Sequence, residues 1–176
     1  MRKKWAISIF SGALLMSSLS SATTLIQQSF DDMVQSASAC VVAEKVSVEY
    51  LDVQGSMVTL TTFQVNDTAF GEVGETIVVR TAGGVKKRGK ISTAEVVAGS
   101  PRFFDNSQSL LLLNENNGTN DYSIVGFSQG VFNVVETAQG ALVNMPENLG
   151  GSLSVDEAVD MMSARRSAGA TIGLPL

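Results

Sequence analysis

The feature that most restricts the fold of this chain is a run of segments, starting at Cys40, in which apolar side chains recur every second residue. This period places the apolar side chains on one face of a β-strand. Two sets of residues are each predicted to share one strand face: Val42, Val46, Val48 and Tyr50 in a first strand, and Met57, Thr59, Thr61, Phe63 and Val65 in a second. Residues 52–56, which include Gly55, are predicted to form the turn between these strands.

Further segments have the composition of strands. Residues 76–81 end at Gly83-Gly84, and residues 110–113 are apolar at every position, which predicts a strand covered on both faces. The remaining predicted strands are 122–127, 131–135 and a short one near 141–143. Only Ser128, Gln129 and Gly130 separate the first two of these. They are therefore predicted to form a hairpin with a left-handed residue at Gly130.

Both ends of the predicted β-region have helical spacing of apolar residues. Residues 24–37 are predicted to form an amphipathic helix. Ser154 and Glu157 have capping-box spacing, and the stripe that follows predicts a second helix: Val155, Ala158, Val159 and Met162. The residues from Ser167 onward are small and predicted to be frayed. The sequence thus predicts a mainly β fold, a small barrel or sandwich of about six to seven strands, with an N-terminal helix and a short C-terminal helix.

Residues 1–22 have the pattern of a Sec-type signal peptide, with a basic start, an apolar run from Trp5 to Met16 and small residues at 20–22. The apolar run is too short for a membrane span, which needs roughly 20 residues. We therefore expect an exported protein, periplasmic or secreted, with a β-barrel domain and leading helix at 23–150 and a C-terminal helix and flexible tail at 151–176. Removal of the signal takes away three basic residues and no acidic one, so the net charge changes from −5 to −8. Such an acidic protein is not expected to bind nucleic acid.

The chain has no His and a single Cys. These counts exclude Ser-His-Asp and Cys-His relays, His-ligated metals and an intramolecular disulfide. Gly126 to Gly130 match the Gly-x-Ser-x-Gly nucleophile elbow, but that motif needs a following helix and a His base. Ser128 is therefore predicted to be a turn residue and Cys40 a buried apolar residue. We expect no catalytic residue, no metal and no cofactor.

Two alternatives remain open on the acidic residues. Asp31-Asp32 and Asp156-Glu157 are predicted to lie on solvated helix faces, whereas Glu44 and Glu49 have opposite parity on the first strand and should point to opposite faces. No pair is favoured for glycosidase-type acid/base chemistry.

The polar segment Asn114–Asp121 offers oxygen ligands suited to calcium but lacks the EF-hand pattern, so a loop rich in turn residues is expected there.

One basic cluster stands out in the acidic chain: Lys86, Lys87, Arg88 and Lys90. It follows Gly83-Gly84 and is predicted to lie on a mobile loop. A solvated charge run is the ordinary interpretation of such a cluster. The functional interpretation is an anionic partner, whose binding would weaken with salt.

One pattern spans residues 33–135 and consists mostly of apolar residues and Gly: Cys40–Val46, Thr59–Val65, Gly71, Gly83, Gly84, Pro101, Phe103, Leu110–Leu113, Gly126 and Gln129–Phe132. In these residues the segment resembles a poorly characterised family of exported bacterial proteins. Two positions depart from the family pattern: Phe70 replaces the usual Lys, and Asn106 replaces the usual Gly. Asn tolerates positive φ, so the turn at Asn106 is expected to survive, as are those at Gly83, Gly84, Gly126 and Gly130.

The same strand order is similar, more distantly, to the netrin-like OB barrels of tissue inhibitors of metalloproteinases. This resemblance implies an OB-like barrel. It does not carry the inhibitor mechanism, which needs an N-terminal Cys, because cleavage after Ala22 would leave Thr23 there.

Two functions remain as hypotheses. The first is a non-enzymatic exported protein that binds an envelope protein or glycan through the segment 83–101 and exposed barrel edges. The alternative is a carboxylate-dependent hydrolase acting on an envelope polymer. The oligomeric state stays open.

Overall fold

The computed structural model describes residues 26–138 and 140–172, so the predicted signal peptide 1–22 lies outside the described residues. The elements in chain order are α1 (Phe30–Ser36), β1 (Ala39–Val53), β2 (Ser56–Phe70), β3 (Thr76–Ala82), β4 (Gly84–Arg88), β5 (Ile91–Glu95), β6 (Gln108–Glu115), β7 (Tyr122–Ile124), the 3-10 helix η1 (Phe127–Gly130), β8 (Val131–Thr137), β9 (Gly140–Asn144), the 3-10 helix η2 (Glu147–Leu149), β10 (Ser152–Ser154) and α2 (Val155–Ile172). Mainly β structure with a helix near each end confirms the predicted fold class.

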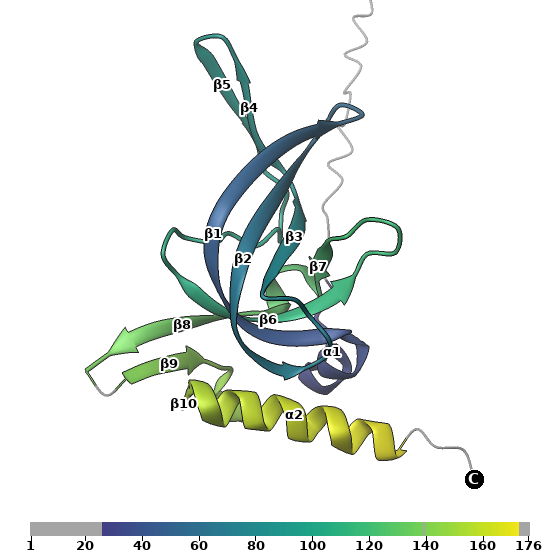
Figure 1. Ribbon diagram of the computed structural model, residues 1–176, viewed down its shortest axis with the longest axis vertical. Coiled ribbons are helices and arrows are strands. Elements are labelled where there is room, and N and C mark those ends of the chain that lie inside the picture. The colour runs from purple at the N-terminus through teal and green to yellow at the C-terminus, as the bar shows by residue number, and fades with distance from the viewer. Residues whose placement is uncertain (1–25, 139, 173–176) are drawn as a thin grey trace, which may run out of the picture.

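Five strands close into a small barrel (Figure 1). β1, β2 and β3 pair in order and antiparallel, and β6 pairs with the other edge of β1. β7 pairs antiparallel with β6 and lies parallel to β3, where Val79 is opposite Tyr122. The sheet therefore returns to its own first strand in the order β1-β2-β3-β7-β6, which is an OB-like arrangement.

Two hydrophobic cores lie on the two sides of the shared strands β1 and β6. The barrel core is the buried cluster Ala39, Val41, Ala43, Phe63, Ile77, Val79, Leu111 and Leu113. The outer core lies between the barrel wall, the two helices and the last strands, and its buried members are Met33, Val34, Ala37, Cys40, Val42, Leu110, Leu112, Val125, Phe132, Val143, Met145, Ala158 and Met162. Alternate residues of β6 thus enter different cores, which confirms that Leu110–Leu113 is covered on both faces.

Cys40 is fully buried, as the sequence predicted, and the structure places it in the outer core. Burial raises the pKa of its thiol far above the ordinary range. The side chain is therefore a neutral apolar packing group rather than a thiolate.

A β-bulge in β1 overturns one prediction about its faces. Lys45 is opposite Phe63 and Ser47 is opposite Thr62, so Val46 is an extra residue and is 63% exposed. A bulge reverses the parity of all later residues. Val42 therefore packs in the outer core while Val48 faces into the barrel, and the prediction of one shared face is wrong.

The predicted hairpin between residues 122–127 and 131–135 is also wrong. β7 and β8 both pair antiparallel with β6, and β7 does so nearer the C-terminal end of β6. The Val125 N–H still donates to the Leu112 carbonyl, and Val131 is opposite Leu111. The two strands are thus one interrupted strand, and residues 126–130, which contain η1, form a five-residue insertion in it.

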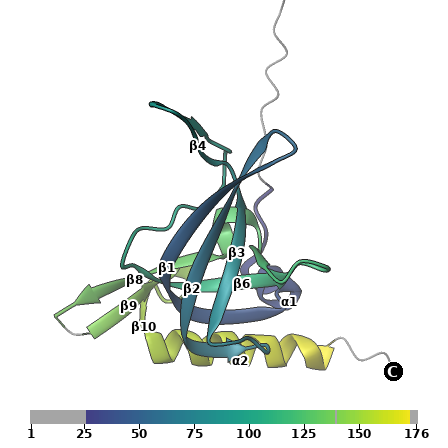
Figure 2. The ribbon, with the colours of Figure 1, turned by 45° about the horizontal axis from the view of Figure 1, so that its top comes forward.

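The helices cover the barrel end opposite the β4–β5 hairpin (Figure 2). α1 begins after Ser29, whose Oγ accepts from the Asp32 N–H, later than the predicted start at residue 24. The capping box is confirmed, because the Ser154 N–H donates to the Glu157 carboxylate and the Glu157 N–H donates to Ser154 Oγ. α2 continues to Ile172, through residues 167–172 that the sequence assigned to a frayed tail.

The two helices are tied to each other by polar contacts. Arg165 forms an ion pair with Asp31, and Gln35 Nε2 donates to the Arg165 carbonyl at 2.8 Å. Arg166 of α2 also lies over the Phe70 ring of β2, 5.3 Å from its centroid, and so joins α2 to the barrel.

None of the helices in the described part of the chain has both the length and the apolar character that a membrane span needs.

Replacing one leucine of β6 tests this two-core arrangement. Leu112→Ala should lower the free energy of unfolding by about 2–5 kcal/mol, because the side chain is fully buried and its removal leaves a cavity. Urea unfolding followed by circular dichroism would measure the change. Val135→Ala, at a position 44% exposed on β8, is the control and should change it by less than about 1 kcal/mol. Equal effects of the two changes would contradict the assignment.

Candidate functional site

A cavity of about 420 Å³ lies at the barrel end that carries the β4–β5 hairpin. We call it the mouth cavity. Its floor is the concave side of β1, β2 and β3, contributed by Val48, Tyr50, Thr59, Thr61 and Thr81. The Val46 bulge is what turns Val48 and Tyr50 toward this side.

The opposite wall of the mouth cavity is the segment before β6, residues 96–104. Phe103 packs edge-on against Phe63 with ring centroids 4.9 Å apart, whereas Phe104 is 71% exposed. Lys45 holds this wall, since its Nζ donates to the Phe103 carbonyl at 3.1 Å and to Asp105 Oδ1 at 2.7 Å. An exposed aromatic ring beside a cavity is a feature of binding surfaces.

The predicted mobile loop after Gly83-Gly84 is a β-hairpin instead. β4 pairs with β5 from Gly84 opposite Glu95 to Arg88 opposite Ile91, so only Gly89 and Lys90 form the turn. We call this unit the basic hairpin. Local sequence pattern does not predict this hairpin, because residues 84–88 and 91–95 carry few large apolar side chains.

Three contacts fix the base of the basic hairpin to the β1–β2 hairpin. Lys86 forms an ion pair with Asp52. The Met57 N–H donates to Glu95 Oε2 at 3.0 Å, and Thr59 Oγ1 donates to the Gly83 carbonyl at 2.7 Å. The hairpin is therefore held at the rim of the mouth cavity.

The four predicted binding cations have different roles. Lys86 is committed to Asp52, whose pKa is lowered first by the Lys86 hydrogen bond and then by the Gly55 N–H. Lys87, Arg88 and Lys90 are exposed, and among the described residues none of them forms an ion pair. Three of the four charges therefore lie in solvent at the turn end of the basic hairpin, whose base lines the mouth cavity.

The predicted turn residues are explained by two different constraints. Gly83 has φ +91°, and a Cβ there would lie 2.7 Å from the Glu95 carbonyl oxygen. Asn106 and Gly126 also have positive φ. Gly130 does not, contrary to expectation; it is required because a Cβ would lie 2.5 Å from the Val125 carbonyl oxygen.

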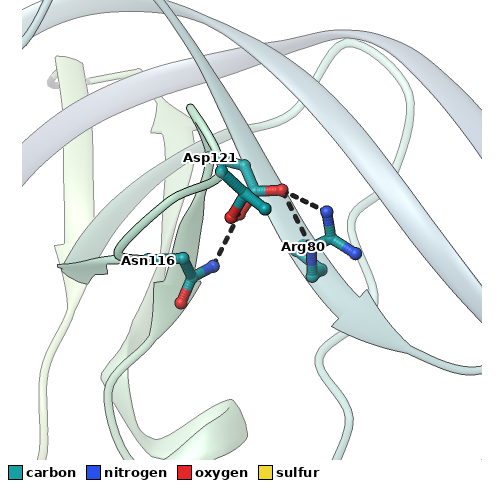
Figure 3. A network of polar contacts seen from close by, with 4 residues as sticks. Arg80, Asn116 and Asp121 are labelled. Carbon is teal, nitrogen blue, oxygen red and sulfur yellow. Dashed lines mark hydrogen bonds and ion pairs between the residues drawn. The ribbon is translucent and has the colours of Figure 1, made fainter.

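The loop considered for calcium is organised around a cation of the protein itself (Figure 3). Asp121, only 6% exposed, accepts from Arg80 Nε at 2.8 Å and from Arg80 Nη2 at 2.6 Å through Oδ2. Its Oδ1 accepts from Asn116 Nδ2 at 2.7 Å and from Thr119 Oγ1 at 2.9 Å. Within the described ranges, no group of three or more acidic or Cys side chains is placed to hold a metal ion.

Burial of the Asp121 carboxyl opposes its ionisation, but the hydrogen bonds from Arg80, Asn116 and Thr119 outweigh burial. The pKa of Asp121 is therefore lowered. The loop is thus a clasp between β3 and β7, the parallel pair that closes the barrel.

A second cavity, of about 460 Å³, adjoins the insertion in the interrupted strand. We call it the side cavity. It shares Thr81, Ala82, Ser100 and Pro101 with the mouth cavity, and its other walls include Arg80 and Phe127. The sequence does not reveal the side cavity, because the spacing of residues 126–130 predicts an ordinary hairpin turn.

The acidic pairs considered for catalysis have structural roles or lie apart. Asp31 pairs with Arg165, and Glu157 caps α2. Glu44 is opposite Gln64 and Glu49 opposite Leu60, so the bulge places both on the same convex face, contrary to the prediction. Four residues of strand, roughly 13 Å, separate them, which is more than the carboxyl spacing of a glycosidase.

Comparisons of the chain with models of protein families, with curated proteins and with solved structures find no match. The candidate site therefore depends on its own geometry.

The Asp121 clasp predicts a pH dependence of stability. Because folding lowers the pKa of this carboxyl, its contribution is full above the unfolded pKa of about 4 and is lost as the pH falls through the folded pKa. At pH 7, Asp121→Asn should therefore cost about 2 kcal/mol, since Arg80 loses a charged acceptor. The difference between the two proteins should shrink toward pH 2. Urea unfolding across this range measures it, and a pH-independent difference would contradict the clasp.

Proposed function

We propose that the protein is a non-enzymatic binding protein of the bacterial cell envelope, exported to the periplasm or secreted. Its ligand is an acidic envelope polymer, bound across the mouth cavity and the basic hairpin. This proposal keeps the resemblance to the exported family and, more distantly, to the netrin-like OB barrels, and the barrel's parallel β3–β7 closure supports the second of them.

One observation carries the proposal: three cations that form no ion pair among the described residues lie together on a hairpin whose base, Gly84, Val85, Ala94 and Glu95, lines the mouth cavity, in a chain of net charge −5. Like charges repel one another, so holding Lys87, Arg88 and Lys90 on one short hairpin is unfavourable in the free protein. Binding of an anionic partner would relieve this repulsion. The contacts of Lys86 and Glu95 provide the rigidity that a mobile charged loop would lack.

The mouth cavity supplies complementary chemistry next to these charges. Tyr50 and Phe104 offer ring faces on which a sugar or a side chain can stack, and Thr59, Thr61 and Thr81 offer hydroxyl groups. The mouth cavity is thus lined by both polar and apolar groups, which is a combination that ligand sites use.

Among the residues that the structure describes, no feature favours the alternative, a carboxylate-dependent hydrolase. A general acid needs a raised pKa so that it is protonated near neutral pH. The carboxyl groups whose pKa the structure displaces, Asp52, Asp121 and Glu157, are all displaced downward.

The test is binding to two polyanions of different backbone, polygalacturonate and polyglutamate, at about 20 mM salt. The triple variant Lys87→Gln, Arg88→Gln, Lys90→Gln should bind about tenfold more weakly, since exposed cations contribute about 0.5 kcal/mol each. Raising salt to about 0.3 M should abolish most of the difference, because the screening length falls below 10 Å. Isothermal titration calorimetry measures both effects.

A second triple variant controls for net charge. Asn133→Asp, Asn144→Asp and Asn148→Asp lower the charge by the same three units at exposed positions in or near β8 and β9. It should bind like the wild type. Equal losses in the two variants would show a general charge effect, and the proposal would then fail.

A further inference from the structure

The side cavity is separate from the proposed polymer site and is not explained by it. The two cavities share only the end of β3 and the Ser100-Pro101 segment. No residue of the basic hairpin lines the side cavity, whereas Gly84, Val85, Ala94 and Glu95 of its base line the mouth cavity.

The insertion that forms this cavity carries a strained, exposed aromatic residue. Gly126 and Phe127 both have left-handed backbone, with φ values of +64° and +59°. This conformation is unfavourable for a bulky aromatic residue, and such strain tends to be kept where function requires it. Phe127 is also 49% exposed, so packing in a core does not account for it.

The insertion is held in place by contacts to two other segments. The Ser128 N–H donates to the Gly99 carbonyl at 3.1 Å. Gln129 Oε1 accepts from the Gln28 N–H, and Gln129 Nε2 donates to the Ile26 carbonyl, each at 3.1 Å. These contacts fix the wall to which Phe127 belongs.

Arg80 is the one charged residue among the twelve that line the side cavity. It donates two hydrogen bonds to Asp121, which is not part of the lining. A guanidinium has five N–H hydrogens, so three of them have no acceptor among the described residues. The Asp121 carboxylate is in turn shared with Asn116 and Thr119.

We propose that the side cavity is a second binding site, which takes a carboxylate joined to an apolar body. The remaining N–H groups of Arg80 bind the carboxylate, because the guanidinium fork matches its two oxygens. The apolar body lies against Phe127, Ile124 and Pro101. The ligand is either a small organic acid or the C-terminal residue of a peptide, since both present the same groups.

The probe for this proposal is 3-phenylpropionate, titrated into isotope-labelled protein and followed by NMR. The signals of the Arg80 Nε–H and the Phe127 amide should shift and saturate. The neutral analogue 3-phenylpropanamide should bind at least tenfold more weakly. Equal affinity for acid and amide, or shifts confined to the mouth cavity, would overturn the proposal.

Phe127→Gly tests the apolar wall without threatening the fold, because glycine adopts positive φ without strain. It should weaken 3-phenylpropionate binding at least fivefold while leaving the unfolding midpoint equal or higher. Phe104→Gly, which removes an exposed ring from the mouth cavity, should leave the affinity unchanged. An unchanged affinity in Phe127→Gly would count against the site.

Two peptides distinguish the possible sources. Gly-Gly-Gly-Phe with a free C-terminus should bind, and its amidated form should not. Tighter binding than 3-phenylpropionate assigns the site to peptide termini, and weaker binding assigns it to small acids. The triple variant of the basic hairpin should bind 3-phenylpropionate and the peptide as tightly as the wild type does. The test of the side cavity therefore does not depend on the outcome of the polymer proposal.

Discussion

The structure depends on one strand, β6, being apolar on both faces. Leu110 and Leu112 belong to the outer core and Leu111 and Leu113 to the barrel core, all fully buried. Because β1 and the interrupted strand pair with its two edges, β6 has neither an exposed face nor a long free edge. Burial of four leucines there fixes the barrel and its helical cover with respect to each other.

The mainly β class, the capping box and the double burial of β6 followed from local sequence pattern, because each is determined by residues close together in the chain. The face assignment of β1 failed at Val46, since one extra residue in a strand leaves no trace in composition. The supposed hairpin at Gly130 failed because spacing alone does not distinguish a reversal of the chain from an outward loop in a continuing strand.

The candidate site was predictable only in part. The sequence identified the cluster from Lys86 to Lys90 by its charge, but not that, among the described residues, Lys86 is the member of the cluster that forms an ion pair, which depends on Asp52 of a different hairpin. Neither cavity was predictable, because each is assembled from strands and loops that are distant in the chain. Arg80 is an example: its strand was predicted, yet its partner Asp121 lies 41 residues later.

The insertion at residues 126–130 has a consequence for how this protein could vary. β7 and β8 keep their pairing with β6 through separate hydrogen bonds on either side of the insertion. A different loop length or sequence at this point, with Gly130 retained, would therefore reshape the wall of the side cavity while the barrel register stayed the same. Ligand preference is then encoded by the insertion, and the fold by the paired residues of β7 and β8 on either side of it. Natural or designed variants could therefore change the ligand preference without disturbing the fold.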